Sequence, residues 1–360
     1  MSSPDAISVE SPESESSAPR PRRWIRFRLV TLMLIVLLFS IWFAFQTYRE
    51  PIGESNLRLL RPVSSMEGKA WEIVFSPDRR SLALLGWETP VTIYDLQSLY
   101  PLRTVCQGRK VIHFAFSSDP NIYAFVENNT FVEIVNAKTE KSLRIDALNQ
   151  QPKVDFSPDG RLLVTGGYGE AAHVWDATNG KQIHRLGVGG IGGGLTPVFS
   201  PDGSKIAIGN RNHTTRVWDT ETGVLLHEFN KAWSHGIAFH PDEDVLAVSY
   251  VNGSFALWDL TTGNLLHHEQ TDAEELYQIE WSRDGKFLIT CGLNADIAIW
   301  QWDGTKVKHL HSLEAPEWVV GATFSPDGTR IITAGGEQAP NTKRTVQVWA
   351  VPLSQRLLGD

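Results

Sequence analysis

A short motif recurs down this chain: an aromatic residue followed by Ser-Pro-Asp-Gly or a close variant. Proline presets φ for the first corner of a turn, aspartate caps backbone N–H groups and glycine accepts positive φ, so each copy predicts a turn between two antiparallel strands. The aromatic positions are separated by 41, 40, 43, 40, 42 and 43 residues, a period that suits four short strands with their turns. The seven copies are Phe75-Ser76-Pro77-Asp78, Phe116-Ser117-Ser118-Asp119, Phe156-Ser157-Pro158-Asp159-Gly160, Phe199-Ser200-Pro201-Asp202-Gly203, Phe239-His240-Pro241-Asp242, Trp281-Ser282-Arg283-Asp284-Gly285 and Phe324-Ser325-Pro326-Asp327-Gly328.

A second signature follows each turn in register with it. An apolar run comes first, as at residues 162–165 and 205–208, and then a further predicted strand that ends in a large apolar residue and, in most copies, a polar one. These endings are Tyr94-Asp95, Val135-Asn136, Trp175-Asp176, Trp218-Asp219, Trp258-Asp259, Trp300-Gln301 and Trp349-Ala350. Three of them are literal Trp-Asp.

With both signatures in phase, the chain resembles the WD-repeat family over about 300 of its 360 residues. The resemblance implies an all-β fold, a seven-bladed β-propeller whose four-stranded blades surround a central channel, over residues 56–353. The Gly-His dipeptide that usually opens a repeat is missing in every blade, and Asp296 is the one candidate for the turn aspartate that pairs with that histidine. The chain therefore resembles a membrane-anchored, bacterial-type member of the family that lacks these dipeptides. The hydrogen-bonded tetrad of the family cannot be transferred to this chain.

A propeller ring must also be closed, because otherwise its first and last blades expose sheet edges. Residues 57–63 are similar in sequence to the predicted outer strands at residues 225–229 and 265–268, so we assign them as the fourth strand of the last blade. The C-terminal residues 353–358 are the alternative source of that strand.

An uncharged run from Leu29 to Phe45, with Trp24, Trp42 and Tyr48 at its margins, predicts a transmembrane helix over residues 24–48. Its seventeen residues would rise roughly 25 Å as a helix, at the short end for a membrane span. A cleaved signal peptide is the alternative, but residues 41–46 are bulky where cleavage requires small side chains. We expect an uncleaved signal anchor.

The charges beside this run predict its orientation. Five arginines precede it, whereas the arginines that follow are diluted by glutamates. The positive-inside rule then places the N-terminus in the cytoplasm and the propeller in the periplasm or outside the cell. Residues 1–23, rich in Ser, Pro and Glu, are expected to be a disordered cytoplasmic tail, with residues 49–55 a linker and residues 354–360 a C-terminal tail.

Charge and cysteine content exclude two classes of protein. A net charge of -8 and an isoelectric point near 5.8 argue against general nucleic-acid binding, which requires a basic face. Cys106 and Cys291 are too few for a disulfide framework.

No residue set with the spacing of a catalytic, metal or cofactor site is found in the sequence. Gly187, Gly189 and Gly192 have dinucleotide-binding spacing, but a strand and not a helix is predicted after them, so we interpret them as a loop. Asp155 and Glu280 each precede the repeat aromatic, three blades apart, and are expected to be solvated or individually paired rather than an acid/base pair. We expect no enzyme activity, no cofactor and no metal.

The family's usual contact position lies six residues before each repeat aromatic, on the face that binds partners. These positions here are Lys69, Lys110, Gln150, Gly193, Trp233, Glu275 and Trp318. Trp233 and Trp318 are expected to be binding hot spots, because tryptophan buries a large area at small entropic cost. The alternative is that each tryptophan only covers the blade beneath it.

Basic residues are predicted on the same face. Arg211 and His213 lie in a loop of the fourth blade, and Lys343 and Arg344 in the long loop 335–344 of the seventh. With Lys69 and Lys110 they would form a mixed aromatic and basic surface that suits an acidic protein segment or an anionic polymer, whereas plain solvation is the alternative for any single charge.

These observations favour a membrane-tethered, non-enzymatic scaffold that binds protein partners through the propeller. A propeller that binds a small ligand or glycan is the alternative, and an enzyme with an axial site is the third hypothesis.

The predicted membrane topology can be tested by extraction and proteolysis. Alkaline carbonate should leave the protein in the membrane pellet, because a spanning helix is not removed by loss of electrostatic contacts. Protease added to intact spheroplasts should digest the propeller. Protection in spheroplasts combined with digestion after lysis would contradict the orientation.

Overall fold

The computed structural model describes residues of the unit Glu50–Asp360, and the unit Met1–Arg49 lies outside its described residues. The described residues are 52, 61–67, 70–76, 80–86, 89–95, 98, 100–127, 131–146, 152–187, 193–194, 196–293, 297–314, 318–325, 327–336 and 345–350. None of them is helical, and in these ranges no helix that could cross a membrane is found. The transmembrane helix expected at residues 24–48 therefore lies outside the described part, as do the expected disordered tail and residues 354–360. Of the expected linker 49–55 only Ile52 is described; it is buried, and its N–H donates to the C=O of Gly328 at 2.6 Å.

The described chain is all-β and is built almost entirely from antiparallel four-stranded sheets. The first strand of each sheet is the innermost: β2 (Ala70–Phe75), β6 (Val111–Phe116), β10 (Val154–Phe156), β16 (Thr196–Phe199), β20 (Ser234–Phe239), β24 (Glu275–Trp281) and β28 (Trp318–Phe324). The second strands are β3 (Ser81–Gly86), β7 (Ile122–Glu127), β11 (Leu162–Thr165), β17 (Lys205–Gly209), β21 (Val245–Tyr250), β25 (Phe287–Leu293) and β29 (Ile331–Gly336). The predicted strands at residues 162–165 and 205–208 are thus confirmed.

The third strands are β4 (Thr89–Asp95), β8 (Phe131–Asn136), β13 (Ala171–Asp176), β18 (Thr214–Asp219), β22 (Ser254–Asp259), β26 (Ile297–Trp302) and β30 (Thr345–Ala350). The outer strands are β5 (Pro101–Val105), β9 (Lys141–Asp146), β14 (Gln182–Gly187), β19 (Leu225–Asn230), β23 (Leu265–Gln270), β27 (Val307–Leu313) and β1 (Arg61–Glu67). Two short strands, β12 (Tyr168–Gly169) and β15 (Gly193–Gly194), pair with each other.

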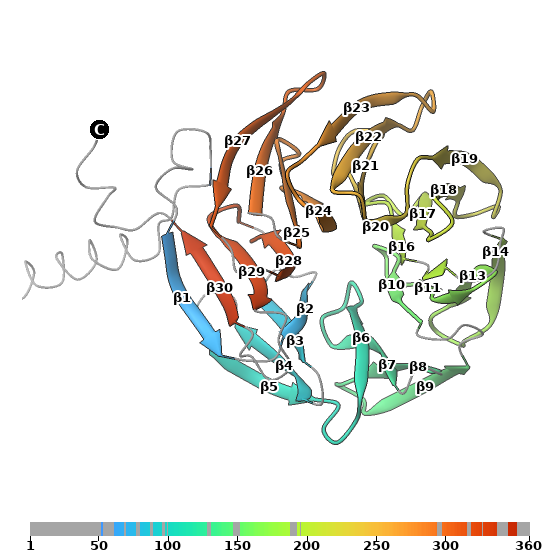
Figure 1. Ribbon diagram of the computed structural model, residues 1–360. Helices are drawn as coiled ribbons and strands as arrows, with labels where there is room; N and C mark the ends of the chain where they lie inside the picture. The colour runs from blue at the N-terminus through green and yellow to red at the C-terminus, as the bar shows by residue number, and fades with distance from the viewer. Residues whose placement is uncertain are drawn as a thin grey trace, which may run out of the picture. The chain divides into compact units, whose positions relative to one another are not determined.

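The sheets are arranged around a central axis, as Figure 1 shows for this unit. The innermost strands contact one another in the order β2, β6, β10, β16, β20, β24 and β28, and β28 contacts β2. One backbone pairing, between Leu293 and Trp318, joins the sheet of β24 to β27 with the sheet of β28 to β30 and β1. This arrangement is consistent with the expected β-propeller.

The repeated turn is held by its serine and aspartate. In the copy beginning at Phe156, Ser157 Oγ donates to Asp159 Oδ1 (2.6 Å) and accepts from the N–H of Leu162 (2.9 Å). Gly160 closes this turn with a φ of 72°, a conformation that favours glycine. Ser200, Ser282 and Ser325 make the same contact with the aspartate two residues on. The turn chemistry expected from the motif is therefore confirmed in these copies.

The third strands place their tryptophans in the core. Trp175 Nε1 donates to Thr165 Oγ1 and Trp300 Nε1 to Thr290 Oγ1, both at 2.9 Å, so a buried indole is bonded within its own sheet without a histidine. The aspartate after Trp175 caps the following turn by accepting from the N–H of Thr178 (2.8 Å). One predicted ending needs correction: β26 runs past Trp300 to Trp302, and Asp303 caps its turn.

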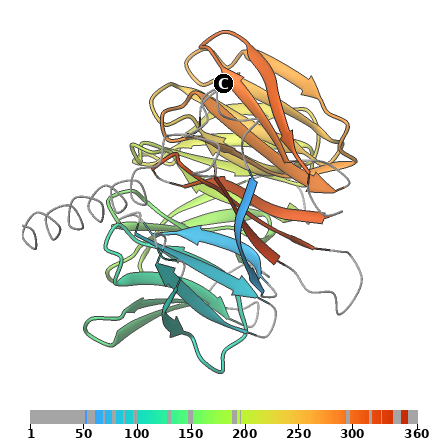
Figure 2. The ribbon, with the colours of Figure 1, turned by 90° about the vertical axis from the view of Figure 1, so that its left-hand side faces the viewer.

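The first and last strands of the described chain pair with each other. β1 lies antiparallel to β30, from Arg61 opposite Ala350 to Glu67 opposite Thr345, and the two strands lie side by side in Figure 2. The expected pairing of an N-terminal strand with the last sheet is present, but the strand covers 61–67 where 57–63 was expected. The alignment with the other outer strands placed the end of the predicted strand too near the N-terminus. Residues 57–60 lie outside the described residues.

Candidate functional site

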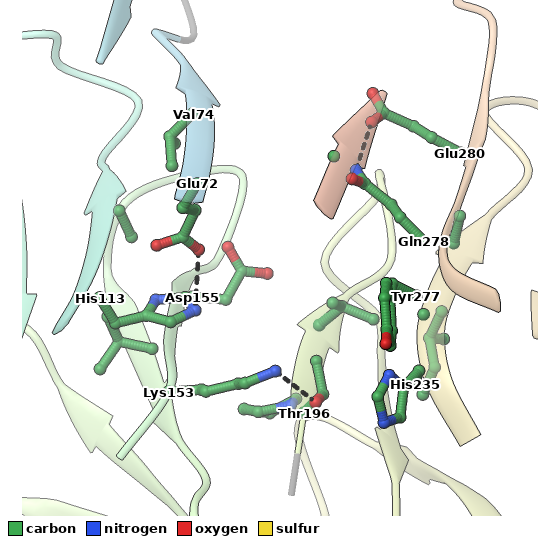
Figure 3. A pocket seen from close by; sticks show the side chains of 18 of the residues that line it. Glu72, Val74, His113, Lys153, Asp155, Thr196, His235, Tyr277, Gln278 and Glu280 are labelled. Atoms are coloured by element: carbon green, nitrogen blue, oxygen red, sulfur yellow. Dashed lines mark hydrogen bonds and ion pairs between the residues drawn. The ribbon is translucent and has the colours of Figure 1, made fainter. Parts of the chain in front are cut away.

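The innermost strands surround a cavity of about 670 Å³. The residues that lie three positions before the repeat aromatic line it in every repeat, five with polar side chains and two glycines: Glu72, His113, Lys153, Thr196, Gln278, Gly236 and Gly321. The labelled residues of this set converge on the cavity in Figure 3. Because these positions are equivalent in each repeat, their polar side chains form a ring at one level of the channel, which we call the polar ring.

β-bulges in five of the innermost strands set the direction of these side chains. A bulge inserts one residue without a partner and bends the strand, which re-aims the neighbouring side chains. The register shifts fall between Ala70 and Glu72, Val111 and His113, Ser234 and Ile237, Leu276 and Gln278, and Val319 and Gly321. His235 and Tyr277 lie within two of these bulges, at the cavity wall.

The polar ring is connected across neighbouring sheets. His113 Nε2 lies 2.9 Å from Glu72 Oε1, and Lys153 Nζ donates to Thr196 Oγ1 at 3.0 Å. Gln278 Oε1 accepts from the N–H of Ala322 in the next sheet at 3.2 Å. These contacts hold the innermost strands at fixed positions relative to one another.

Two carboxyl groups, one residue before the repeat aromatic, also face the cavity and are hydrogen-bonded individually. Asp155 Oδ2 accepts from the N–H of Phe199 (2.9 Å), and Glu280 Oε1 accepts from Thr323 Oγ1 (2.6 Å). Burial raises the pKa of Asp155 to about 6 and that of Glu280 to about 7, because the charged form loses its hydration, while these hydrogen bonds oppose the shift. The expectation of individually paired carboxylates is confirmed.

Aromatic and basic side chains form a continuous series, which we call the rim ladder: Tyr168, Arg211, Trp233, His235, Tyr277 and Trp318. All of them except Trp318 line the cavity. The guanidinium carbon of Arg211 lies 5.1 Å from the ring centre of Tyr168 and 4.2 Å from that of Trp233. The ring of His235 lies edge-on to Trp233 at 5.2 Å and is stacked on Tyr277 at 5.3 Å.

Tyr277 meets Trp318 edge-on at 6.4 Å, which completes the ladder. The ladder thus spans five consecutive sheets. Its aromatic members are partly buried, so each keeps some accessible surface.

The field at this end of the cavity disfavours added positive charge. Burial lowers the pKa of Lys153, and the nearby Arg211 lowers it further, whereas Glu72 raises it. Burial, together with Lys153 and Arg211, also lowers the pKa of His235 to about 4. At neutral pH His235 is therefore an uncharged imidazole.

The structure brings some of the predicted site residues together and not others. Trp233, Trp318 and Arg211 belong to the rim ladder. Lys110 and His213 are exposed and do not line the cavity, and His213 has a φ of 69° in its turn. Lys69 and Arg344 lie outside the described residues.

The sequence reasoning missed Lys153, His235, Tyr277, Tyr168 and the Glu72–His113 pair. The third position before the repeat aromatic would have identified Glu72, His113 and Lys153, because it is occupied by polar residues in several copies. The bulge residues His235 and Tyr277 break simple alternation, so period-two reasoning does not place them beside those residues.

Among the described residues no group of three or more His, Cys, Asp or Glu side chains could hold a metal ion. Cys291 is buried and Cys106 partly buried, and neither forms a disulfide.

Comparisons with known proteins find WD40 repeats in the middle of the chain. Residues 153–176 and 184–219 match the family model described as WD domain, G-beta repeat. Residues 230–284 match the model described as anaphase-promoting complex subunit 4 WD40 domain. These stretches contain Lys153, Arg211, Trp233, His235 and Tyr277, and they support the resemblance to the WD-repeat family.

A curated relative also contains such repeats. The WD repeat-containing protein SL1-17 of Schistosoma mansoni is 28% identical over 128 residues, which are 35% of this chain. The match spans 42% of that relative, less than half of its length.

The raised pKa of Glu280 predicts a pH-dependent stability that glutamine should remove. The folded-state pKa of about 7 lies above the ordinary value of 4.5, so the penalty is absent below the ordinary value and grows until pH passes the folded-state pKa. Glu280→Gln should therefore stabilise the protein by on the order of 2 kcal/mol near pH 8 and much less at low pH. Urea unfolding near pH 4 and near pH 8 measures this, with the exposed Glu274→Gln as control. A difference that does not grow with pH would contradict the burial of a costly charge.

Proposed function

We propose that this chain is a membrane-tethered, non-enzymatic WD-repeat propeller of seven blades, and that it acts as a protein-interaction scaffold through the rim ladder. The observation that carries the proposal is the continuity of the ladder from Tyr168 to Trp318. Proteins with WD40 repeats generally mediate protein–protein interactions, and the matched repeats include most of this surface.

The composition of the ladder is that of a binding hot spot. Trp, Tyr and Arg are enriched at such positions because they bury large areas and carry directional donors, and the energetically important residues cluster. The guanidinium carbon of Arg211 lies over the Trp233 ring while the residue stays exposed, so N–H donors of Arg211 remain accessible to a partner. Two tryptophans at the family's contact position fit this role.

The membrane tether is the part of the proposal that rests on sequence. The uncharged run from Leu29 to Phe45 and the arginines before it support a signal anchor with a cytoplasmic N-terminus. In that arrangement the propeller would meet partners in the periplasm or outside the cell. Lys69, Lys110, His213 and Arg344 remain predicted contributors to the partner surface.

A small-ligand function is the second candidate, because the cavity volume of about 670 Å³ falls within the range of roughly 300–1,000 Å³ typical of ligand sites. The ladder favours a protein partner, since its members extend along the wall over several sheets. If the chain is a scaffold, truncating the ladder should weaken binding of a protein partner; if it is a ligand site, truncation should weaken binding of a small ligand.

Truncation of the two tryptophans tests the scaffold function. Partner recovery by proximity labelling in intact membranes should fall for Trp233→Ala and Trp318→Ala, because a hot-spot tryptophan contributes on the order of 2 kcal/mol or more, about thirtyfold in affinity. Tyr100→Ala is the matched control, since Tyr100 is 74% exposed at the start of an outer strand. Its labelling pattern should equal that of the unmodified protein.

Thermal melting of each variant separates binding from folding. If the tryptophans only cover the strands beneath them, the variants will melt earlier and the folded fraction will label the same partners as before. Unchanged labelling in both tryptophan variants would rule out the ladder as the docking surface.

A further inference from the structure

Two basic side chains that line the cavity, the buried Lys153 and the exposed Arg211, lack an ion-pair partner in the described part of the chain. Lys153 Nζ donates to Thr196 Oγ1 at 3.0 Å, and an ammonium group has three N–H donors, so further donors face the cavity. Arg211 contacts the rings of Tyr168 and Trp233, and no carboxylate among the described residues lies within 4.0 Å of either cation. Unpaired cations in a cavity favour an anion.

The acidic groups of the cavity are hydrogen-bonded to partners other than Lys153 and Arg211, although Glu72 lies near enough to raise the pKa of Lys153. Glu72 is bonded to His113 at 2.9 Å. Asp155 and Glu280 are bonded to neighbouring sheets, and burial disfavours their charged forms. None of these carboxyl groups therefore forms an ion pair with Lys153 or Arg211.

Aromatic surface borders this positive end. Trp233 and Tyr277 flank His235, and all three line the cavity together with Arg211 and Lys153. Figure 3 shows Lys153 extending toward Thr196 across the cavity from His235 and Tyr277. A carboxylate on a short side chain would meet donors from Lys153, Arg211 and the His235 imidazole while its neighbouring residues covered the rings.

We propose that this end of the cavity binds the carboxylate of an Asp or Glu side chain in an acidic segment of the protein partner. Lys153 supplies a buried amine whose charged form the bound carboxylate would favour, the exposed Arg211 supplies a guanidinium, and the aromatic ladder covers the residues on either side. The inference rests on the proposed scaffold function and specifies the chemistry of the partner.

The overall charge of the chain does not attract an acidic segment to this site. With a net charge of -8, the protein as a whole repels an acidic segment. Attraction must therefore come from local contacts with Lys153 and Arg211 and not from the general surface. Binding should weaken as salt screens these contacts where they meet solvent.

A pair of synthetic peptides tests the inference on the purified full-length protein in detergent. Isothermal titration calorimetry compares acetyl-Gly-Glu-Glu-Phe-Glu-Glu-Gly-amide with its counterpart in which every Glu is Gln. The acidic peptide should bind, and the glutamine peptide should bind at least about tenfold more weakly, since a hydrogen bond to a charged group contributes this much. Absence of binding by the acidic peptide, or equal affinity for both, would overturn the inference.

Variants locate the site. Lys153→Met and Arg211→Gln should each weaken the acidic peptide by at least about tenfold, and Lys153→Arg should retain most of the affinity. Lys205→Met is the matched control, because Lys205 is paired with Asp244 at 2.9 Å and does not line the cavity. Thermal melting should be no lower for Lys153→Met, which removes a buried cation. Unchanged affinity in a folded Lys153→Met protein would overturn the assignment.

Partner labelling distinguishes failure of the inference from failure of the scaffold function. Labelling that is lost in Trp233→Ala and kept in Lys153→Met would overturn the acidic-segment inference and leave the scaffold function standing. Labelling that is kept in both, and in Trp318→Ala, would overturn the scaffold function itself.

Discussion

Antiparallel pairing between β1 and β30 joins two segments that are about as far apart in sequence as the described chain allows. Without β1, the backbone N–H and C=O groups of β30 would form an unpaired sheet edge. The contacts between consecutive innermost strands, including that between β28 and β2, depend on the last sheet being held in place. Every feature of the cavity depends in turn on those strands, because no single sheet contains the polar ring or the rim ladder.

The site results from two features of the repeat, its strand pairing and its bulges. The turn motif and the paired strands place equivalent residues around a common axis, and the bulges then aim different side chains into the cavity at each position. The strand pattern repeats, but the residue types at equivalent positions differ from one repeat to the next. One wall of the cavity therefore carries stacked rings while another carries the Glu72–His113 pair. The fold supplies the positions, and the residue types at those positions supply the chemistry.

Much of the fold could be predicted from the sequence because the repeat is local. The Ser157–Asp159 contact and the strand after it lie within a few residues of each other, and the structure has both. Trp233, Arg211 and Trp318 were predicted to share a surface; in the structure Arg211 lies over the ring of Trp233, and Trp318 contacts Tyr277. Lys153 and Tyr277 were not predicted, because their importance arises from neighbours in other sheets and from a bulge that alternation does not reveal. β1 extends to Glu67, past the predicted end at residue 63, because its assignment rested on similarity to other strands and not on pairing.

Closure by the N-terminal strand is the claim on which the cavity and its proposed role most directly rest. Thermal melting of a fragment that begins at Asn56 can be compared with one that begins at Gly68, which lacks all of β1. The account predicts a clearly lower and broader transition for the shorter fragment, because the last sheet loses its outer strand. Equal melting temperatures would contradict it and would mean that another segment, such as residues 353–358, closes the ring.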